Sequence, residues 1–111
     1  MPIKRKPKEP FKTLEFKGKF KDFGDFYDKN KRSIYESIFE IFKEFKTTKE
    51  KSLCLFVSAK IQGLDWDTEF NFHKAEAIVL KRDLMPFFED IEDYETCQDI
   101  NSLYKDLTNS K

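Results

Sequence analysis

Alternation of hydrophobic and polar residues is most regular in the middle of the chain. Apolar side chains fall on every second residue from Ser52 to Gln62 and again from Trp66 to Phe72. A period of two is typical of strands that bury one face. We therefore predict a β-hairpin, in which the buried face holds Leu53, Leu55, Val57, Ala59 and Ile61 from the first strand and Trp66, Thr68, Phe70 and Phe72 from the second.

The residues between these strands set the register of the hairpin. We place a two-residue type II′ turn at Gly63 and Leu64, because this turn takes glycine at its first central position. The register that follows pairs Val57 with Phe70. A slip of one residue would turn the apolar side chains to the opposite face.

Three other segments repeat hydrophobic residues at intervals of three and four, as the buried face of a helix does. The first helix is predicted to follow an aromatic turn at Phe23–Tyr27, to open at Asp28 or Asn30 and to run to about Lys46. A second helix is predicted to open at Asp83 and a last one at Thr96. Their buried stripes are Ile34, Ile38, Ile41, Phe42 and Phe45, then Leu84, Phe87, Phe88, Ile91 and Tyr94, and finally Ile100, Leu103, Tyr104 and Leu107.

Two shorter runs complete the pattern. From Phe11 to Phe20, apolar residues including Leu14 and Phe16 alternate with Lys17 and Lys19, which predicts a half-buried strand. The run from 75 to 80 is too short for its period to separate a third hairpin strand from the start of a helix, and we favour the strand.

These elements predict one small α+β domain over residues 11–111. Its centre is the β-hairpin, within an antiparallel sheet of about three to four strands that packs against amphipathic helices. The expected order is strand, helix, two hairpin strands, an optional further strand and two helices. Residues 1–10 contain three of the four prolines and are predicted to form a flexible basic arm.

Composition changes this picture in two ways. The 13 Phe, 4 Tyr and single Trp predict an aromatic core, although charged residues make up 38% of the chain. The net charge is zero but unevenly spread, with eight basic against three acidic residues in Met1–Asp22 and three against eight in Arg82–Lys111. No apolar run has the length of a membrane span, and two cysteines are too few for a disulfide scaffold, so we expect a cytoplasmic protein.

Few residues are suited to catalysis or to cofactor binding. Three glycines and one histidine exclude glycine-rich phosphate loops and multi-histidine metal sites, and no cofactor is expected. Cys54 would lie opposite His73 in the predicted register, so an imidazole-activated thiolate is one hypothesis. Alternating carboxylates at Asp65, Asp67 and Glu69 suggest a cation site, but we favour a solvated outer face, because Lys60 would lie opposite Asp67 and neutralise it.

These patterns favour a non-enzymatic protein-binding module of accessory or regulatory type, whose partner is another protein or a second copy of the chain. We expect an acidic rim at Glu89, Glu92 and Asp93 to select that partner. The composition, rich in Lys, Phe, Ile and Asn, suits a phage or low-GC bacterial protein. The alternative is a single-stranded nucleic-acid binder that uses interleaved basic and aromatic residues, namely Lys17, Lys19, Lys21, Phe23 and Phe56.

Overall fold

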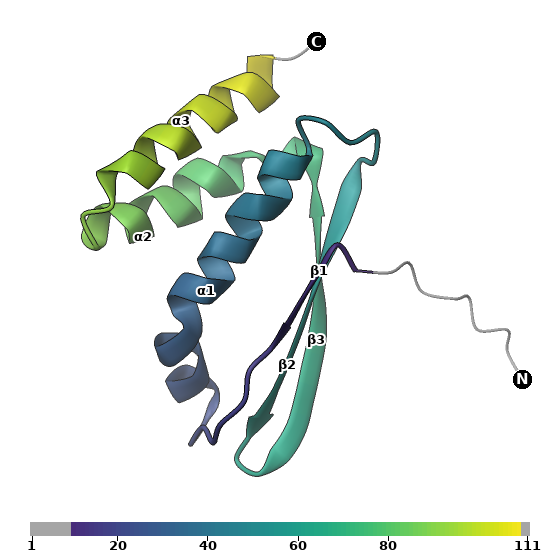
Figure 1. Ribbon diagram of the computed structural model, residues 1–111, viewed down its shortest axis with the longest axis vertical. Coiled ribbons are helices and arrows are strands. Elements are labelled where there is room, and N and C mark those ends of the chain that lie inside the picture. Colours follow the sequence, from purple (N-terminus) through teal and green to yellow (C-terminus); the bar gives the residue numbers. More distant parts are fainter. Residues whose placement is uncertain (1–9, 110–111) are drawn as a thin grey trace, which may run out of the picture.

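A computed structural model describes residues 10–109 as a small α+β domain (Figure 1). Three α-helices lie on one side of a three-stranded sheet. The side of the sheet that faces away from the helices is its outer face. The elements in chain order are β1 (Lys12–Glu15), α1 (Phe23–Glu44), β2 (Ser52–Ile61), β3 (Leu64–His73), the 3₁₀ turn η1 (Lys74–Glu76), the π-helical turn η2 (Leu80–Leu84), α2 (Met85–Asp90) and α3 (Tyr94–Asn109).

The sheet is mixed, whereas the sequence predicted an antiparallel one. Its strand order is β1-β2-β3, and β1 runs parallel to β2. The 22-residue helix α1 connects these two strands and carries the chain back to the end of the sheet where β1 began. Strands joined by such a crossover pair in parallel, while only the short hairpin connection makes an antiparallel pair.

The hairpin has the predicted faces but a different register. Its turn residues are Gln62 and Gly63, with φ angles of 55° and 77°, as a type I′ turn requires. Leu55 therefore lies opposite Phe70, and the predicted pairing of Val57 with Phe70 is wrong. The displacement is two residues, which preserves the side on which every side chain lies.

Helix α1 begins earlier than the sequence predicted. Phe23–Tyr27 is helical rather than a turn, because Asp22 acts as N-cap and its carboxylate accepts a hydrogen bond from the backbone N–H of Asp25 at 2.8 Å. The predicted apolar stripe is confirmed, with Ile34 half-buried and the others buried. The second half of the helix lies between the sheet and the α2–α3 pair, so it buries residues on both sides (Figure 1).

The segment from 75 to 80 is helical, so the favoured third hairpin strand is wrong. Strand β3 ends where the backbone N–H of His73 donates to the Glu76 carboxylate at 2.8 Å. The chain then enters the wide turn η2, where the N–H of Met85 bonds to the carbonyl of Leu80. Pro86 follows directly, and its missing N–H and bulky ring disfavour an ordinary α-helical turn there.

Helix α3 begins at Tyr94, two residues before the predicted opening at Thr96. No helix between residues 10 and 109 is long and apolar enough to cross a membrane. Residues 1–9 of the predicted basic arm lie outside the described part of the chain.

Candidate functional site

Strand β3 is ten residues long, and one of its edges is free except at its last residue, His73, whose N–H donates to the Glu76 carboxylate. β2 borders it on one side, and no strand within residues 10–109 borders it on the other. In a two-residue hairpin the residues that flank the turn, Ile61 and Leu64, exchange backbone hydrogen bonds, and bonding then alternates along the strands. The N–H of Lys74 donates to the carbonyl of Lys51 at 2.9 Å, which continues the same alternation at the far end. The residues whose N–H and C=O groups point away from β2 are therefore Asp65, Asp67, Glu69, Asn71 and His73. The N–H of His73 is already bonded to Glu76, so the free N–H groups are those of the other four residues.

The side chains of β3 divide into an apolar row and an acidic row. On the side of the helices, aromatic rings of α1 cover two members of the apolar row. Phe23 meets Trp66 with ring centroids 5.1 Å apart, and Phe42 meets Phe72 at 5.8 Å. Leu64 and Phe70 lie in the same row but remain 70% and 43% exposed. The acidic row on the outer face consists of Asp65, Asp67 and Glu69, all exposed.

A hollow of about 650 Å³ lies beside this acidic row, at the hairpin end of the sheet. It forms because the first strand separates from β2 after Phe16, whose N–H donates to the carbonyl of Ser58 at 2.9 Å. The chain rejoins β2 at Phe20, whose carbonyl accepts from the N–H of Gln62 at 2.9 Å. Gly18, with a φ of 124°, lies at the bend between these two contacts.

Charges of both signs line the hollow, from Lys17, Lys19 and Lys60 on one hand and Glu15, Asp65 and Asp67 on the other. One pair is in direct contact, with the Lys60 ammonium 3.3 Å from the Asp65 carboxylate. This mixture gives no strong field for a polyanion, since carboxylates lie beside the lysines that would bind phosphate.

The residues predicted to bind nucleic acid do not form one patch. Lys17 and Lys19 line the hollow, and Phe56 lies half-buried on the outer face opposite Glu69. Phe23 lies on the other side of the sheet against Trp66. Lys21 immediately precedes the N-cap of α1, and its backbone N–H donates to Asp25 at 3.0 Å.

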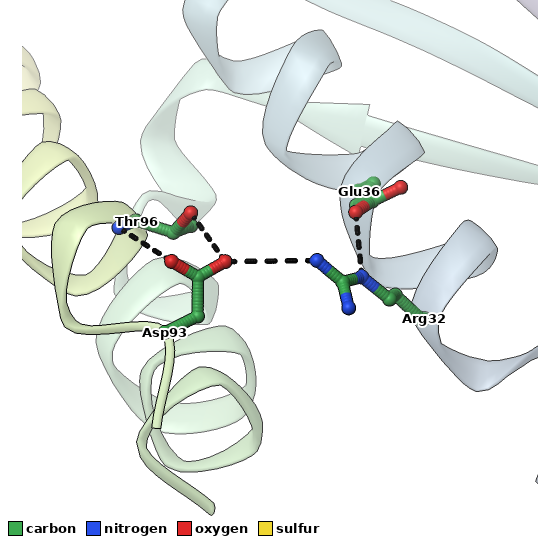
Figure 2. Close-up of polar contacts among 4 residues, drawn as sticks. All are labelled: Arg32, Glu36, Asp93 and Thr96. Atoms are coloured by element: carbon green, nitrogen blue, oxygen red, sulfur yellow. Dashed lines mark hydrogen bonds and ion pairs between the residues drawn. The ribbon is translucent and has the colours of Figure 1, made fainter. Parts of the chain in front are cut away.

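The predicted acidic rim lies around the turn between α2 and α3, and its three members have different environments. Glu89 and Glu92 are exposed. Asp93 instead accepts hydrogen bonds from the N–H of Thr96 at 3.2 Å and from its hydroxyl at 2.8 Å (Figure 2). The same carboxylate lies 3.8 Å from the Arg32 guanidinium of α1. Asp93 is therefore held by contacts within the domain.

The hypothesised cysteine–histidine pair is wrong in its geometry. The observed register places Cys54 opposite Asn71, and His73 opposite Ser52. Burial raises the pKa of the Cys54 thiol, and the nearby Glu69 carboxylate raises it further. Both effects disfavour the nucleophilic thiolate.

The hypothesised cation site has no ligand cluster in the described chain. Between residues 10 and 109, no three His, Cys, Asp or Glu side chains lie close enough together to hold a metal ion. Asp65, Asp67 and Glu69 alternate along one extended strand, where they are spread out rather than directed at one point.

Comparison with known proteins finds no matching protein-family model, no matching curated protein and no matching solved structure.

Proposed function

We propose that this chain is a non-enzymatic protein-binding module that docks its partner along the free edge of β3, from Leu64 to Phe72. The observation that carries the proposal is the free edge of this strand, which ends only at His73, with Leu64 and Phe70 exposed beside it. Exposed edges pair readily with other chains, and natural proteins usually shorten, cover or charge them. Here the edge is long, and exposed apolar side chains flank it on one face, as expected of a surface that another protein covers.

The acidic row gives this edge selectivity. Carboxylates along a free strand discourage indiscriminate pairing, because a neighbouring strand must neutralise them or leave like charges opposed. The edge is therefore suited to a particular partner rather than to aggregation.

Affinity capture with two matched double variants tests the proposal. One variant carries Leu64→Ser and Phe70→Ser, and the other carries Glu89→Lys and Glu92→Lys at the α2–α3 turn. Proteins retained from a lysate of the source organism are identified by mass spectrometry, and thermal melting checks the fold of each variant.

We expect the serine variant to lose the partners that the parent protein retains, and the lysine variant to keep them. The opposite pattern would move the docking surface to the acidic rim predicted from the sequence. Equal capture by all three proteins would contradict docking at either surface.

A second candidate function is binding of single-stranded nucleic acid. It is favoured by the grouping of Lys17, Lys19 and Lys60 around the hollow, on the face that also holds Phe56. Its test is fluorescence anisotropy with labelled oligonucleotides, in which binding should weaken steeply with salt and fall when Lys17, Lys19 and Lys21 are replaced by glutamine. Absence of binding at low salt would eliminate this function.

A further inference from the structure

We infer that the partner contributes an extended segment in which basic and apolar residues alternate, and that this segment adds to β3 as a fourth strand. The inference rests on the proposed function and specifies the chemistry of its partner. It follows from three properties of β3: the direction of its free backbone groups, the charge of its outer row and the exposure of its inner row.

The backbone fixes which residues of β3 would bond the incoming segment. The N–H and C=O groups directed away from β2 belong to the odd-numbered residues of the strand, among them Asp65, Asp67 and Glu69. In an antiparallel pair, a residue of the incoming segment that exchanges hydrogen bonds with Asp67 lies directly opposite it, and its side chain lies on the same face. Every second residue of the segment would therefore project beside the acidic row.

Charge determines what those residues must be. Among residues 10–109, β3 makes one ion pair, in which the Lys60 ammonium lies 3.3 Å from the Asp65 carboxylate. Within the same residues, Asp67 and Glu69 form no ion pair with a basic side chain. Lys or Arg opposite these carboxylates would neutralise them, whereas Asp or Glu would be repelled. The segment is thus expected to be basic at alternate positions.

The residues between them face the side of the helices. There they would extend the apolar row and cover Phe70 and Leu64, the two members that α1 leaves exposed. Apolar β-branched or aromatic residues suit these positions, because they pack well against such neighbours on a strand.

A second copy of this chain is a poorer occupant of the edge. Pairing β3 with its own copy would bring three further carboxylates to the outer face of the combined sheet. The electrostatic repulsion that results would grow as the salt concentration falls, whereas a basic segment would bind more tightly at low salt.

Two fluorescein-labelled peptides of identical composition test the inference. In the first, four lysines alternate with three valines, and in the second the lysines are grouped at one end. Binding to the full chain is measured by fluorescence anisotropy. We expect the alternating peptide to bind about tenfold more tightly or better, because only it can place all lysines on one face of a strand.

Two substitutions at one position separate strand addition from simple charge attraction. Asp67→Asn removes the carboxylate alone, while Asp67→Pro also removes an N–H that points to the free edge and makes no bond to β2. The proline variant should bind the alternating peptide about tenfold more weakly than the asparagine variant. If the proline variant melts early, the pair Glu69→Gln and Glu69→Pro replaces it with the same expected difference, because the N–H of Glu69 points to the same edge.

Equal affinity for the two peptides, or equal affinity of the two Asp67 variants where both fold, would overturn the inference. A second copy would be the occupant if the chain dimerises with increasing concentration, loses this dimer with Asp67→Pro and does not bind the peptide. That result would also overturn the inference. If the alternating peptide does not bind but partner capture is still lost with Leu64→Ser and Phe70→Ser, strand addition is refuted and the proposed function stands.

Discussion

The backbone at Gln62 and Gly63 decides which residues of the hairpin face each other. Both have positive φ angles, a conformation that glycine and asparagine adopt more readily than other residues. No atom lies within 4 Å of the place where a Cβ on Gly63 would be, so any cost of adding one comes from the backbone alone.

We predict that Gly63→Ala lowers the free energy of unfolding by about 1 kcal/mol and that Gln62→Asn raises it by a few tenths of a kcal/mol. Urea denaturation measures both changes. Gly24→Ala is the matched control, because Gly24 lies in the first turn of α1, where alanine is favoured and its Cβ would meet only ordinary contacts. A loss with Gly24→Ala as large as that with Gly63→Ala would contradict the special role of the turn.

Asp93 provides a second test at this scale, because its carboxylate contacts residues of two helices. It caps the start of α3 through Thr96 and approaches Arg32 on α1 (Figure 2). We expect Asp93→Ala to cost about 1 kcal/mol of stability, as the loss of a helix cap usually does, and Glu89→Ala to be nearly neutral. Chemical denaturation of the two variants decides, and equal stabilities would mean that the cap contributes nothing measurable.

Helix α1 is the element on which the packing of the domain depends, since the sheet lies on one side of it and the α2–α3 pair on the other. Phe42 is fully buried and contacts Phe72 of β3, and Ile38 is buried on the same helix. We predict that Phe42→Ala and Ile38→Ala each lower the free energy of unfolding by about 2 to 5 kcal/mol, because each leaves a cavity.

Glu40→Ala is the control for these core substitutions. Glu40 is exposed and bonds to Lys12 of β1 at 2.7 Å, and surface pairs of this kind contribute at most about 1 kcal/mol. The denaturant midpoint of Glu40→Ala should therefore be clearly higher than the midpoints of Phe42→Ala and Ile38→Ala. Losses below about half a kcal/mol for both core substitutions would show that this face of α1 is not packed.

The elements that were predicted correctly share one property, which is that a local period determines them. The stripe of α1 and the two faces of the hairpin follow from the spacing of residues such as Ile38, Phe42 and Val57. The register depended instead on whether Gln62 would accept a positive φ, which its own propensity does not favour. The parallel pairing of β1 and the helical state of 75–80 depend on contacts between distant segments, which periodicity does not record.

The candidate docking edge was harder to predict from the sequence than the fold. Alternation placed Phe70 on the buried face, and that face is correct, but aromatic rings of α1 cover Trp66 and Phe72 and leave Phe70 between them exposed. Leu64 was assigned to the turn and is the first residue of the strand. The one available signal was the row of carboxylates from Asp65 to Glu69, which marks a solvent-facing strand without showing that its edge is free.

Over the whole molecule, folding brings together charges that are separated in the sequence. Basic residues on or just after α1 approach acidic residues near or on α3, as Arg32 does with Asp93 at 3.8 Å and Lys46 with Asp106 at 3.0 Å. On the outer face, Lys17 and Lys19 share a hollow with Asp65 and Asp67. The acidic residues near the C-terminus thus help to join the helices, while the sheet presents mixed charge to a partner.

This arrangement lets one variant separate the two candidate functions. Replacing Asp65, Asp67 and Glu69 by their amides keeps the size and the strand propensity of the outer row while removing three negative charges. A basic strand loses its ionic partners, so the affinity for the alternating lysine–valine peptide should fall by about tenfold or more. For a nucleic-acid strand the variant lacks three repulsive carboxylates, two of which share the hollow with Lys17 and Lys19, so any affinity for a labelled oligonucleotide should rise.

Both affinities are measured by anisotropy at two salt concentrations, with the parent protein and a Glu89→Gln, Glu92→Gln variant as references. The reference variant removes two carboxylates away from the sheet, so it shows how strongly a loss of negative charge elsewhere on the protein changes each affinity. If a protein binds at the β3 edge, the affinity for the peptide should fall when the acidic row is replaced and should change little when Glu89 and Glu92 are replaced. A rise in oligonucleotide affinity with unchanged peptide affinity would favour the nucleic-acid-binding function. In that case the three carboxylates repel an oligonucleotide and contribute nothing to the binding of a basic peptide.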